Sequence, residues 1–334
     1  MSVQRTGIGS PPTAAPAHHD PPQPGGRRVP RRRFLRGGAL TALGAAAAVG
    51  GLAGASGCGR VSLASDVPGG NLLEQLREKG QVRLGIAGEI PMGYIDDQAR
   101  LTGQSPTVAR TVFQRLGVGT TTAVPTDFGS LIPGLKAGLF DCIAAGMYIT
   151  PERCQEIAFS DPDYQMPDAF ITGRGNPAGL RDYTDIAADD SVVLGVASGG
   201  IQISYAESFG VPQSRVRVFP DNLAALDGLL AGRTTVMAAT SITLRNLLAD
   251  GSHPQLEMTE PFFPVIDGVK QWGAGGYGFH PLQTRLRDAF NVELAKLKAS
   301  GELLRLVRPF GYTEAEMTDL TAEELCAGTA GAGA

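Results

Sequence analysis

The segment DFGSLIPGLKAGLFDCIAAGMYITPERCQEIAFSDP, residues 127–162, contains the pattern that decides the fold. Ser130 begins a short helical pattern that ends at Gly138, and an apolar run with the character of a buried strand follows at 141–145. Alternation of short apolar strands with amphipathic helices is typical of α/β proteins, in which helices cover a parallel sheet. The segment therefore predicts one helix–strand unit of such a sheet.

The same alternation extends from this segment in both directions along the chain. Strands are expected before it at 81–87 and 120–124, and strands alternate with helices after it from 191 to 250. A long amphipathic helix is expected at about 282–300, with its apolar residues on one face. We expect this last block to be helical, to form no further sheet and to pack back on the first series of elements.

These elements predict an α/β fold with two lobes, each built on a parallel-rich sheet. The first lobe is expected to be discontinuous and to consist of residues 70–173 and 272–330, while residues 176–268 form the second lobe. Two segments would then cross between the lobes. Because ligands of open parallel sheets bind beyond the C-terminal ends of the strands, we expect a cleft between the two lobes.

The beginning of the chain has the composition of an export signal, and residues 1–57 also include a proline-rich leader that we expect to be disordered. The basic stretch RRRFLR (31–36) precedes an uncharged run at 37–57, which ends before Cys58. These are the parts of a twin-arginine (Tat) lipoprotein signal. The run is too rich in alanine and glycine for a good permanent membrane span. We expect lipidation of Cys58, a linker at 58–69, and anchoring to the outer face of the cell membrane through the lipid alone.

Charge and residue pattern argue against several classes of protein. Seven of the arginines but a single acid lie in residues 1–57, so the exported part is more acidic than the whole chain, whose net charge is −4. No basic patch remains that would indicate a nucleic acid partner. The sequence has no nucleophile–base pair, phosphate-binding loop or metal-ligand cluster, so we expect no enzyme, cofactor or metal. Cys154 and Cys326 are the candidates for a disulfide, whereas Cys142 is expected to be a buried thiol.

Several strings along the chain resemble one family. The order of the helix, the strand, ITPER and FSDP in residues 127–162 is similar to that of the family-3 solute-binding proteins. The strings FGSLIPGLKAG (128–138), AAGMYITPERC (144–154) and DGVKQWGA (267–274) resemble the ectoine- and hydroxyectoine-binding subgroup. The resemblance extends to PFGYTEAEM and EELC near the C-terminus.

The resemblance implies a function as well as a fold. The fold would be the two-lobed, type II periplasmic-binding-protein fold. The protein would be a monomeric, extracytoplasmic (periplasmic) solute-binding lipoprotein that delivers a compatible solute to the permease of an ABC transporter for osmoprotection.

Arg153 and Glu89 are the charged residues that we expect to contact the ligand. Arg153 follows the strand at 141–145, and a guanidinium there can hold a carboxylate with two hydrogen bonds. The alternative is an ion pair at the start of a surface helix. Glu89 follows the strand at 81–87 and can face a cation, unless it is simply an exposed loop residue. In the resembled subgroup, the matching arginine holds the ligand carboxylate and the matching glutamate contacts the ring nitrogens.

Phe128 and Tyr148 each follow a strand of the first lobe, so both rings can reach the cleft and stack on a delocalised cation. Core packing is the alternative for both. The third position of the subgroup's aromatic cage falls on Met92, whose thioether attracts a cation less than an aromatic ring does.

The second lobe provides an argument about ligand type. The turn at Gly199, Gly200 and Ile201 begins a helix, and its backbone N–H groups can bind an anion. In relatives that bind α-amino acids, an aspartate that holds the α-ammonium follows the next helix, and Thr240 stands at that position here. This favours ectoine over an amino acid. A polar amino acid, another compatible solute, and an exported enzyme similar to cyclohexadienyl dehydratase remain alternatives.

Overall fold

The structure is a computed structural model that describes residues 71–330. The expected export signal, the lipidation site at Cys58 and the linker at 58–69 lie outside the described residues. Two sheets organise the described part of the chain, and both belong to one compact unit. We call each sheet with the helices that cover it a lobe.

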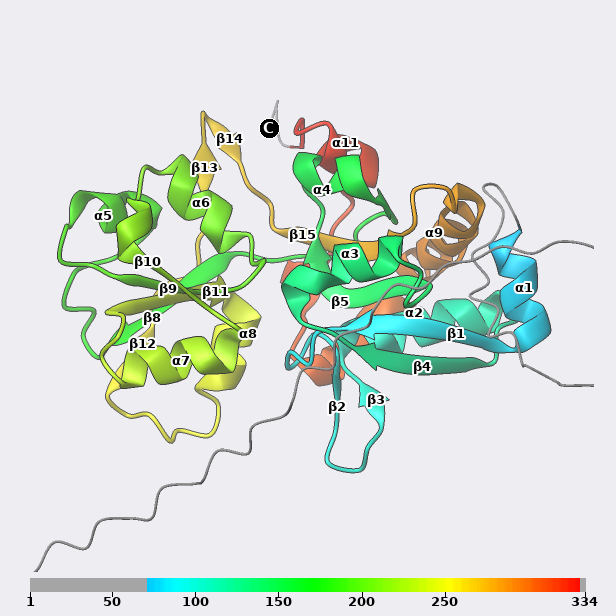
Figure 1. The fold of residues 1–334 in the computed structure, drawn as a ribbon, viewed down its shortest axis with the longest axis horizontal. Coiled ribbons are helices and arrows are strands. Elements are labelled where there is room, and N and C mark those ends of the chain that lie inside the picture. The colour runs from blue at the N-terminus through cyan, green and yellow to red at the C-terminus, as the bar shows by residue number, and fades with distance from the viewer. Residues whose placement is uncertain (1–70, 331–334) are drawn as a thin grey trace, which may run out of the picture. The chain divides into compact units, whose positions relative to one another are not determined.

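The sheet of the first lobe has the strand order β4–β1–β5–β15–β6, and β7 pairs with β15. β1 is parallel to β4 and β5, whereas β15 is antiparallel to its neighbours. The strands are β1 (Gln81–Ile86), β4 (Thr120–Pro125), β5 (Cys142–Tyr148), β6 (Ala158–Phe159), β7 (Tyr164–Gln165) and β15 (Ala274–Phe279). A small hairpin of β2 (Tyr94–Ile95) and β3 (Leu101–Thr102) extends from it (Figure 1).

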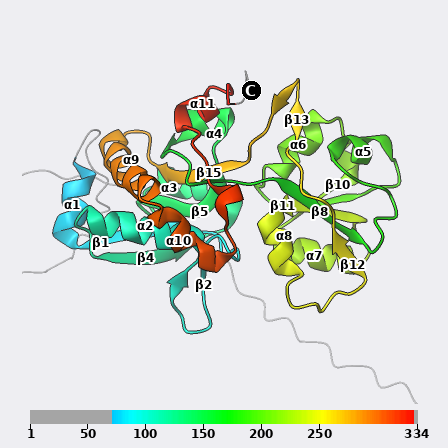
Figure 2. The ribbon, with the colours of Figure 1, turned by 180° about the vertical axis from the view of Figure 1, so that it is seen from behind.

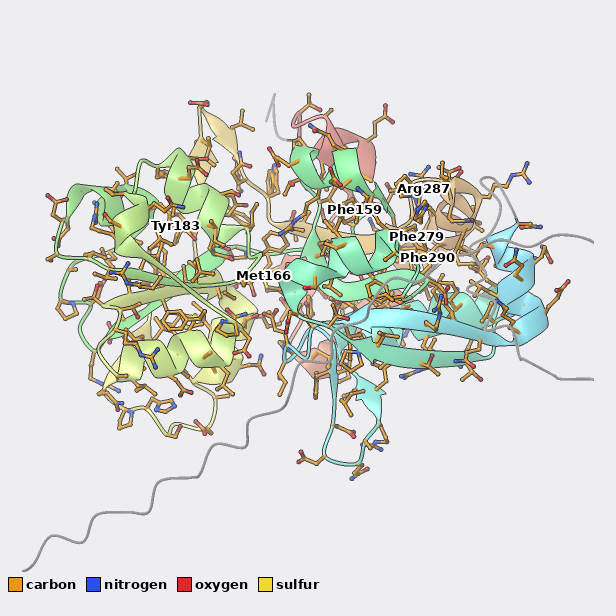
Figure 3. All side chains as sticks on the ribbon, viewed as in Figure 1. Phe159, Met166, Tyr183, Phe279, Arg287 and Phe290 are labelled. Atoms are coloured by element: carbon orange, nitrogen blue, oxygen red, sulfur yellow. A yellow bond between two sulfur atoms is a disulfide. The ribbon has the colours of Figure 1, made fainter. Side chains whose placement is uncertain are left out.

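Helices cover both faces of this sheet. Figure 1 shows α3 in front of the sheet, and Figure 2 shows α2, α9 and α10 on the opposite face. Phe290 of α9 packs against Phe279 of β15 within the larger core cluster, where Figure 3 labels both rings. The helices of this lobe are α1 (Leu72–Lys79), α2 (Gln104–Arg115), α3 (Leu131–Lys136), α4 (Pro151–Glu156), α9 (Thr284–Ala299), α10 (Glu302–Val307) and α11 (Ala322–Cys326).

The sheet of the second lobe has the order β10–β9–β11–β8–β12, in which β9 is parallel to β10 and β11. β8 is antiparallel to β11 and β12. Its strands are β8 (Asp168–Gly173), β9 (Leu194–Ala197), β10 (Val216–Phe219), β11 (Val236–Thr240) and β12 (Leu256–Met258), and its helices are α5 (Tyr183–Ala188), α6 (Gln202–Ser208), α7 (Asn222–Leu230) and α8 (Ser241–Leu247). Tyr183, the first residue of α5, is labelled in Figure 3 and is fully buried in the core of this lobe.

Two expectations from the sequence differ from these sheets. Residues 168–173, expected in the first lobe, form β8 and pair with two strands of the second sheet, so the first crossover comes earlier, near Met166. The block 272–330 was expected to be helical, yet its segment 274–279 is the strand β15 in the first sheet. Its sequence, AGGYGF, is rich in glycine and lacks the alternating pattern that marks a half-buried strand. The second crossover carries the short hairpin of β13 (Val265–Ile266) and β14 (Val269–Lys270).

Candidate ligand-binding site

A cavity lies where the C-terminal strand ends of both lobes meet. Ala87 after β1, Tyr148 at the end of β5, Ala197 at the end of β9 and Thr240 at the end of β11 all line it. This is where an open parallel sheet is expected to bind its ligand. The cavity volume is about 60 Å³, and a water needs roughly 10–15 Å³ on this scale. The space therefore suits one small solute rather than a peptide or an oligosaccharide.

The structure brings the predicted contact residues together. All of them except Gly199 line the cavity: Glu89, Met92, Phe128, Tyr148, Arg153, Gly200, Ile201 and Thr240. The carbonyl oxygen of Gly199 accepts a hydrogen bond from Arg153 at 3.0 Å instead. Gly199 also marks a close approach of the lobes, because a Cβ atom on it would lie 2.7 Å from Cα of Gly129.

Arg153 is placed by the short helix α4, whose N-cap Thr150 accepts a hydrogen bond from the Arg153 backbone N–H at 3.3 Å. The guanidinium donates to the carbonyl oxygen of Tyr148 at 2.8 Å, and its carbon lies 5.7 Å from the centre of the Phe128 ring. Desolvation lowers the pKa of Arg153, which means that the charged form is disfavoured by its surroundings. Within residues 71–330, Arg153 forms no salt bridge.

Glu89 lies in the loop after β1 and is partly buried. Its Oε1 accepts two hydrogen bonds from the second lobe, from Oγ1 of Thr243 at 2.7 Å and from Nδ2 of Asn222 at 3.0 Å. Burial raises the pKa of Glu89, and the nearby Asp221 adds to this effect, while the two donated hydrogen bonds act against it. Glu89 also has no salt bridge with any described residue.

The cavity therefore contains a guanidinium and a carboxylate that do not pair with each other. A desolvated charge is unfavourable unless an opposite charge or several hydrogen bonds compensate it. Both groups line the same small space, and their hydrogen-bond partners among the described residues are all neutral. The arrangement can hold a small molecule that carries an anionic group near Arg153 and a cationic group near Glu89.

The three predicted cage positions differ in exposure. Phe128, in the 3₁₀ turn Phe128–Ser130, is partly exposed to the cavity. Tyr148 is 4% exposed, and its hydroxyl donates to the carbonyl oxygen of Met166 at 3.3 Å. Met92 is 2% exposed, and its sulfur accepts a hydrogen bond from the hydroxyl of Tyr312 at 3.1 Å. Met92 thus contributes one edge to the cavity and belongs mainly to the core of the first lobe.

Thr240, at the position where an aspartate holds the α-ammonium in amino-acid-binding relatives, caps a helix of the second lobe. The hydroxyl of Thr240 lies 2.8 Å from the hydroxyl of Thr243. As N-cap of α8, it also accepts a hydrogen bond from the backbone N–H of Thr243. Because Thr243 in turn donates to Glu89, the two threonines form a neutral hydrogen-bonded chain that ends at the carboxylate. Thr240 itself therefore offers an α-ammonium a hydroxyl and no charge.

Asn222, Thr243 and Gln202 belong to the site but were not predicted from the sequence. Asn222 and Gln202 are the first residues of α7 and α6 and both line the cavity. The amide of Gln202 donates to the buried carboxylate of Asp168 at 3.0 Å, and Tyr183 donates to the same group at 2.8 Å. Burial raises the pKa of Asp168 to about 7. The helix starts were recognisable in the sequence, but no local pattern reveals which polar side chain at a helix start turns towards another lobe.

Asp163 in the first lobe has a matching arrangement. It is 1% exposed and accepts hydrogen bonds from Gln104, the first residue of α2, at 2.6 Å and from Tyr277 at 2.7 Å. Burial raises its pKa to about 6. Each lobe therefore has a buried aspartate that fixes the glutamine at the start of a helix next to the strand ends.

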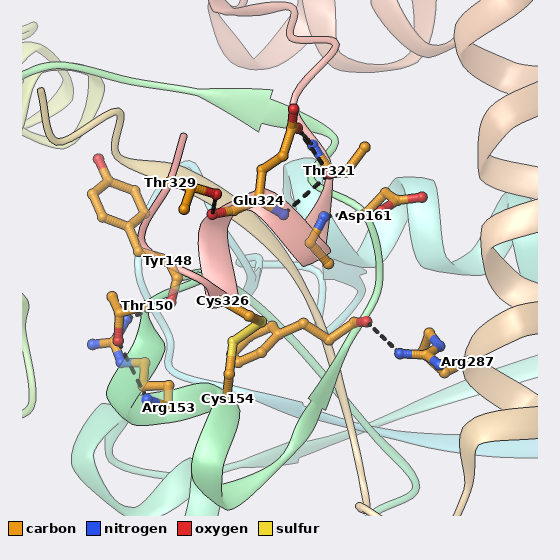
Figure 4. Close-up of a disulfide and its surroundings, with 12 residues drawn as sticks. Tyr148, Thr150, Arg153, Cys154, Asp161, Arg287, Thr321, Glu324, Cys326 and Thr329 are labelled. Carbon is orange, nitrogen blue, oxygen red and sulfur yellow. Dashed lines mark hydrogen bonds between the residues drawn. A yellow bond between two sulfur atoms is a disulfide. The ribbon is translucent and has the colours of Figure 1, made fainter. Parts of the chain in front are cut away.

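Cys154 of α4 and Cys326 of α11 form a disulfide, with a Cα–Cα distance of 5.6 Å (Figure 4). Cys142 in β5 is a fully buried thiol. In residues 71–330, no group of three potential metal ligands comes together. The same residues contain no helix with the length and hydropathy needed to cross a membrane.

Comparison with known proteins identifies relatives of the chain. The family model of the bacterial extracellular solute-binding proteins, family 3, matches residues 82–312. The probable amino-acid ABC transporter periplasmic-binding protein y4tE of Sinorhizobium fredii is 33% identical over 270 residues, which cover 79% of this chain and 89% of that protein. The lysine/arginine/ornithine-binding periplasmic protein of Escherichia coli is 28% identical over 193 residues, which cover 57% and 71%.

Among solved structures, EhuB in complex with hydroxyectoine is 38% identical to this chain. The superposition has a TM-score of 0.71 and covers 77% of this chain and 98% of EhuB.

Proposed function

We propose that the chain, which belongs to the bacterial extracellular solute-binding proteins of family 3, binds ectoine or hydroxyectoine. As a member of this family it is a solute-binding protein of an ABC transporter of the amino-acid type, with a small-molecule ligand and a permease as partners. The observation that carries the class of ligand, a small zwitterion, is the pair of desolvated charges without a salt bridge among the described residues, Arg153 and Glu89, in one small cavity. Within that class, the neutral Thr240 favours ectoine over an α-amino acid. The similarity to EhuB, solved with hydroxyectoine, supports the same choice.

Ectoine suits this cavity because it is a small cyclic zwitterion with one carboxylate and one delocalised amidinium. We place the carboxylate at Arg153, whose guanidinium can donate two parallel hydrogen bonds. The amidinium would then face Oε2 of Glu89, because Oε1 is already occupied by Asn222 and Thr243. Phe128 offers its ring face to the flat cation, a contact of about 0.5–2 kcal/mol.

Closure of the lobes follows from the same contacts. Glu89 and Arg153 belong to the first lobe, yet their hydrogen bonds reach Asn222, Thr243 and Gly199 of the second lobe. Closing removes water from both charges, and a zwitterion compensates that cost on both sides. A ligand with both charges therefore favours the closed form, which the permease recognises in our proposal.

An amino acid is the second candidate, because the named relatives from Sinorhizobium fredii and Escherichia coli are amino-acid transport proteins. Thr240 argues against it, since its hydroxyl is a neutral cap and gives an α-ammonium no charged partner. Isothermal titration calorimetry with ectoine, hydroxyectoine, arginine and histidine tests the choice. Saturable heat with ectoine or its hydroxylated form supports the proposal, whereas no heat at millimolar ectoine together with tight arginine binding refutes it.

The same samples test for catalysis. We propose a binding protein rather than a dehydratase-like enzyme, so mass spectrometry after overnight incubation should recover each bound solute unchanged. A new product that depends on the protein would contradict this.

We further propose that residues 1–57 are a Tat export signal and that a lipid on Cys58 anchors the protein outside the cell membrane, as a monomer. The linker at 58–69 would lead to the two lobes. Cys58→Ser is expected to move the protein from the membrane fraction to the medium or periplasm and to abolish labelling by a palmitate analogue. Retention of the variant in the membrane fraction would contradict a lipid anchor.

A further inference from the structure

The helix that carries Arg153 has little support of its own. α4 has six residues, and none of them is buried. Its non-covalent ties are the Thr150 cap at its start, an exposed ion pair between Glu156 and Lys136 of α3, the hydrogen bonds of the Arg153 guanidinium, and the buried Ile157 that follows its last residue. An exposed ion pair adds little to stability, typically less than about 1 kcal/mol. A helix of this length is not stable by itself, so α4 depends on these contacts and on further support.

The disulfide provides that support. Cys154, the residue after Arg153, is bonded to Cys326, which lies 172 residues later in α11. Figure 4 shows the bond between the two short helices, with Arg153 of α4 and its cap Thr150 nearby. Both sulfurs also pack against the core cluster that contains Leu325.

In contrast to α4, α11 is well anchored. Leu325 is 7% exposed and packs in the core of the first lobe. Asp161 accepts a hydrogen bond from the backbone N–H of Ala322 at 3.0 Å. Thr321 and Glu324 cap the start of the helix reciprocally (Figure 4). The disulfide therefore connects a helix that buries none of its residues to one that is anchored in the core.

We propose that the Cys154–Cys326 disulfide is a positioning device for Arg153, and that it sets the affinity for the ligand carboxylate. This inference rests on the proposed function, in which Arg153 holds that carboxylate. From the observed placement of α4, the guanidinium reaches the carbonyl oxygens of Tyr148 and Gly199 with hydrogen bonds of 2.8 and 3.0 Å. Without the bond, the ligand has to order α4 and the arginine side chain as it binds, and that ordering reduces affinity.

A consequence is that the affinity for the ligand depends on whether Cys326 is bonded to Cys154 or is a free thiol. The bond joins the binding site to the last described helix, so loss of α11 or reduction of the disulfide weakens binding without any change in a residue that touches the ligand.

A double-mutant cycle measured by calorimetry with ectoine tests the proposal. The Cys154→Ala, Cys326→Ala double variant is expected to bind about tenfold more weakly than the wild type. In an Arg153→Lys background, the pair of parallel hydrogen bonds to the ligand carboxylate is already lost. There the same two substitutions should change Kd by less than about twofold. Cys142→Ser, which removes a buried thiol outside the site, is the control and should leave Kd unchanged.

Two results of the cycle would overturn the proposal: an unchanged Kd in the double variant, or an equal loss of affinity in both backgrounds. The second result would mean that the disulfide only stabilises the lobe as a whole. A melting temperature well above the assay temperature ensures that each variant is folded. The single variant Cys326→Ala repeats the test with the sequence of α4 intact.

Hydrogen–deuterium exchange without ligand separates this inference from the proposed function. The amides of residues 152–157 should exchange faster in the double variant, while those of α9 keep their rates. If the wild type does not bind ectoine, the proposed function fails, and exchange alone decides the role of the bond. Unchanged exchange in α4 would then refute the positioning role, and faster exchange confined to α4 would support it.

Discussion

Replacement of Glu89 by glutamine keeps the shape of the side chain and removes its charge. In the wild type, Oε1 accepts hydrogen bonds from Thr243 at 2.7 Å and Asn222 at 3.0 Å, and a glutamine oxygen can accept both. The lobes of the Glu89→Gln variant should therefore still close. What the variant lacks is the negative charge that we place opposite the ligand amidinium.

The expected effects on binding and on stability have opposite signs. Loss of one partner of a buried, hydrogen-bonded charge pair costs about 2–4 kcal/mol, or roughly 30- to 700-fold in Kd. Without ligand, burial raises the pKa of Glu89, so the ionised carboxylate is unfavourable in the closed lobes. Removing it should raise the free energy of unfolding, and with it the Tm of the ligand-free protein.

Calorimetry with ectoine and thermal unfolding of the ligand-free protein, both at pH 7.5, measure the two effects. The control is Glu260→Gln, because Glu260 is exposed and forms no side-chain hydrogen bond or salt bridge in the described structure; it should behave as the wild type. Ectoine binding that is as tight in Glu89→Gln as in the wild type would refute the placement of the cation. A fall in both affinity and Tm would show that Glu89 is structural instead.

Three further predictions concern the contact between the lobes, the arginine that we place at the ligand carboxylate, and the buried Asp168. Gly199→Ala should weaken ectoine binding at least tenfold, because its Cβ would meet Gly129 at 2.7 Å, whereas Gly210→Ala, with a similar positive φ and open space, should not change Kd. Arg153→Lys should weaken binding by about 1–3 kcal/mol, since one of two parallel hydrogen bonds is lost, and calorimetry that finds no change would contradict this. The raised pKa of Asp168 (about 7, against 3.8) means that the folded state binds its proton more tightly than the unfolded state does, so this group makes stability fall as pH rises from 4 to 7. Urea unfolding measures this: the free energy of unfolding of Asp168→Asn, relative to that of the wild type, should rise by about 2–4 kcal/mol from pH 4 to pH 8. The same difference between variant and wild type at both pH values would contradict the prediction.

The sequence predicts much of the fold because the apolar residues of most helices and strands recur at a clear spacing. α9 was expected at about 282–300 and is found at Thr284–Ala299, since its apolar residues recur every three to four positions. β15 was not expected, because AGGYGF has glycines where a half-buried strand alternates apolar and polar residues. β8 was assigned to the wrong lobe, because the chain order of strands does not tell which sheet a strand joins.

The part of the candidate site that could be predicted consists of residues that directly follow strands in the sequence. Arg153, Glu89 and Phe128 were identified in this way, together with a family resemblance, and all three line the cavity. Asn222 and Thr243 were missed because they contact Glu89 across 133 and 154 residues of sequence. A contact between lobes depends on how the lobes are placed, and no local pattern encodes it.

A crystal structure of the protein with ectoine would test the central claim most directly. It should place both ligand carboxylate oxygens within hydrogen-bond distance of the Arg153 guanidinium and the ring nitrogens beside Oε2 of Glu89, with Phe128 against the ring face. A ligand bound in the reverse orientation, or bound outside this cavity, would contradict the claim that the two unpaired charges select a zwitterion.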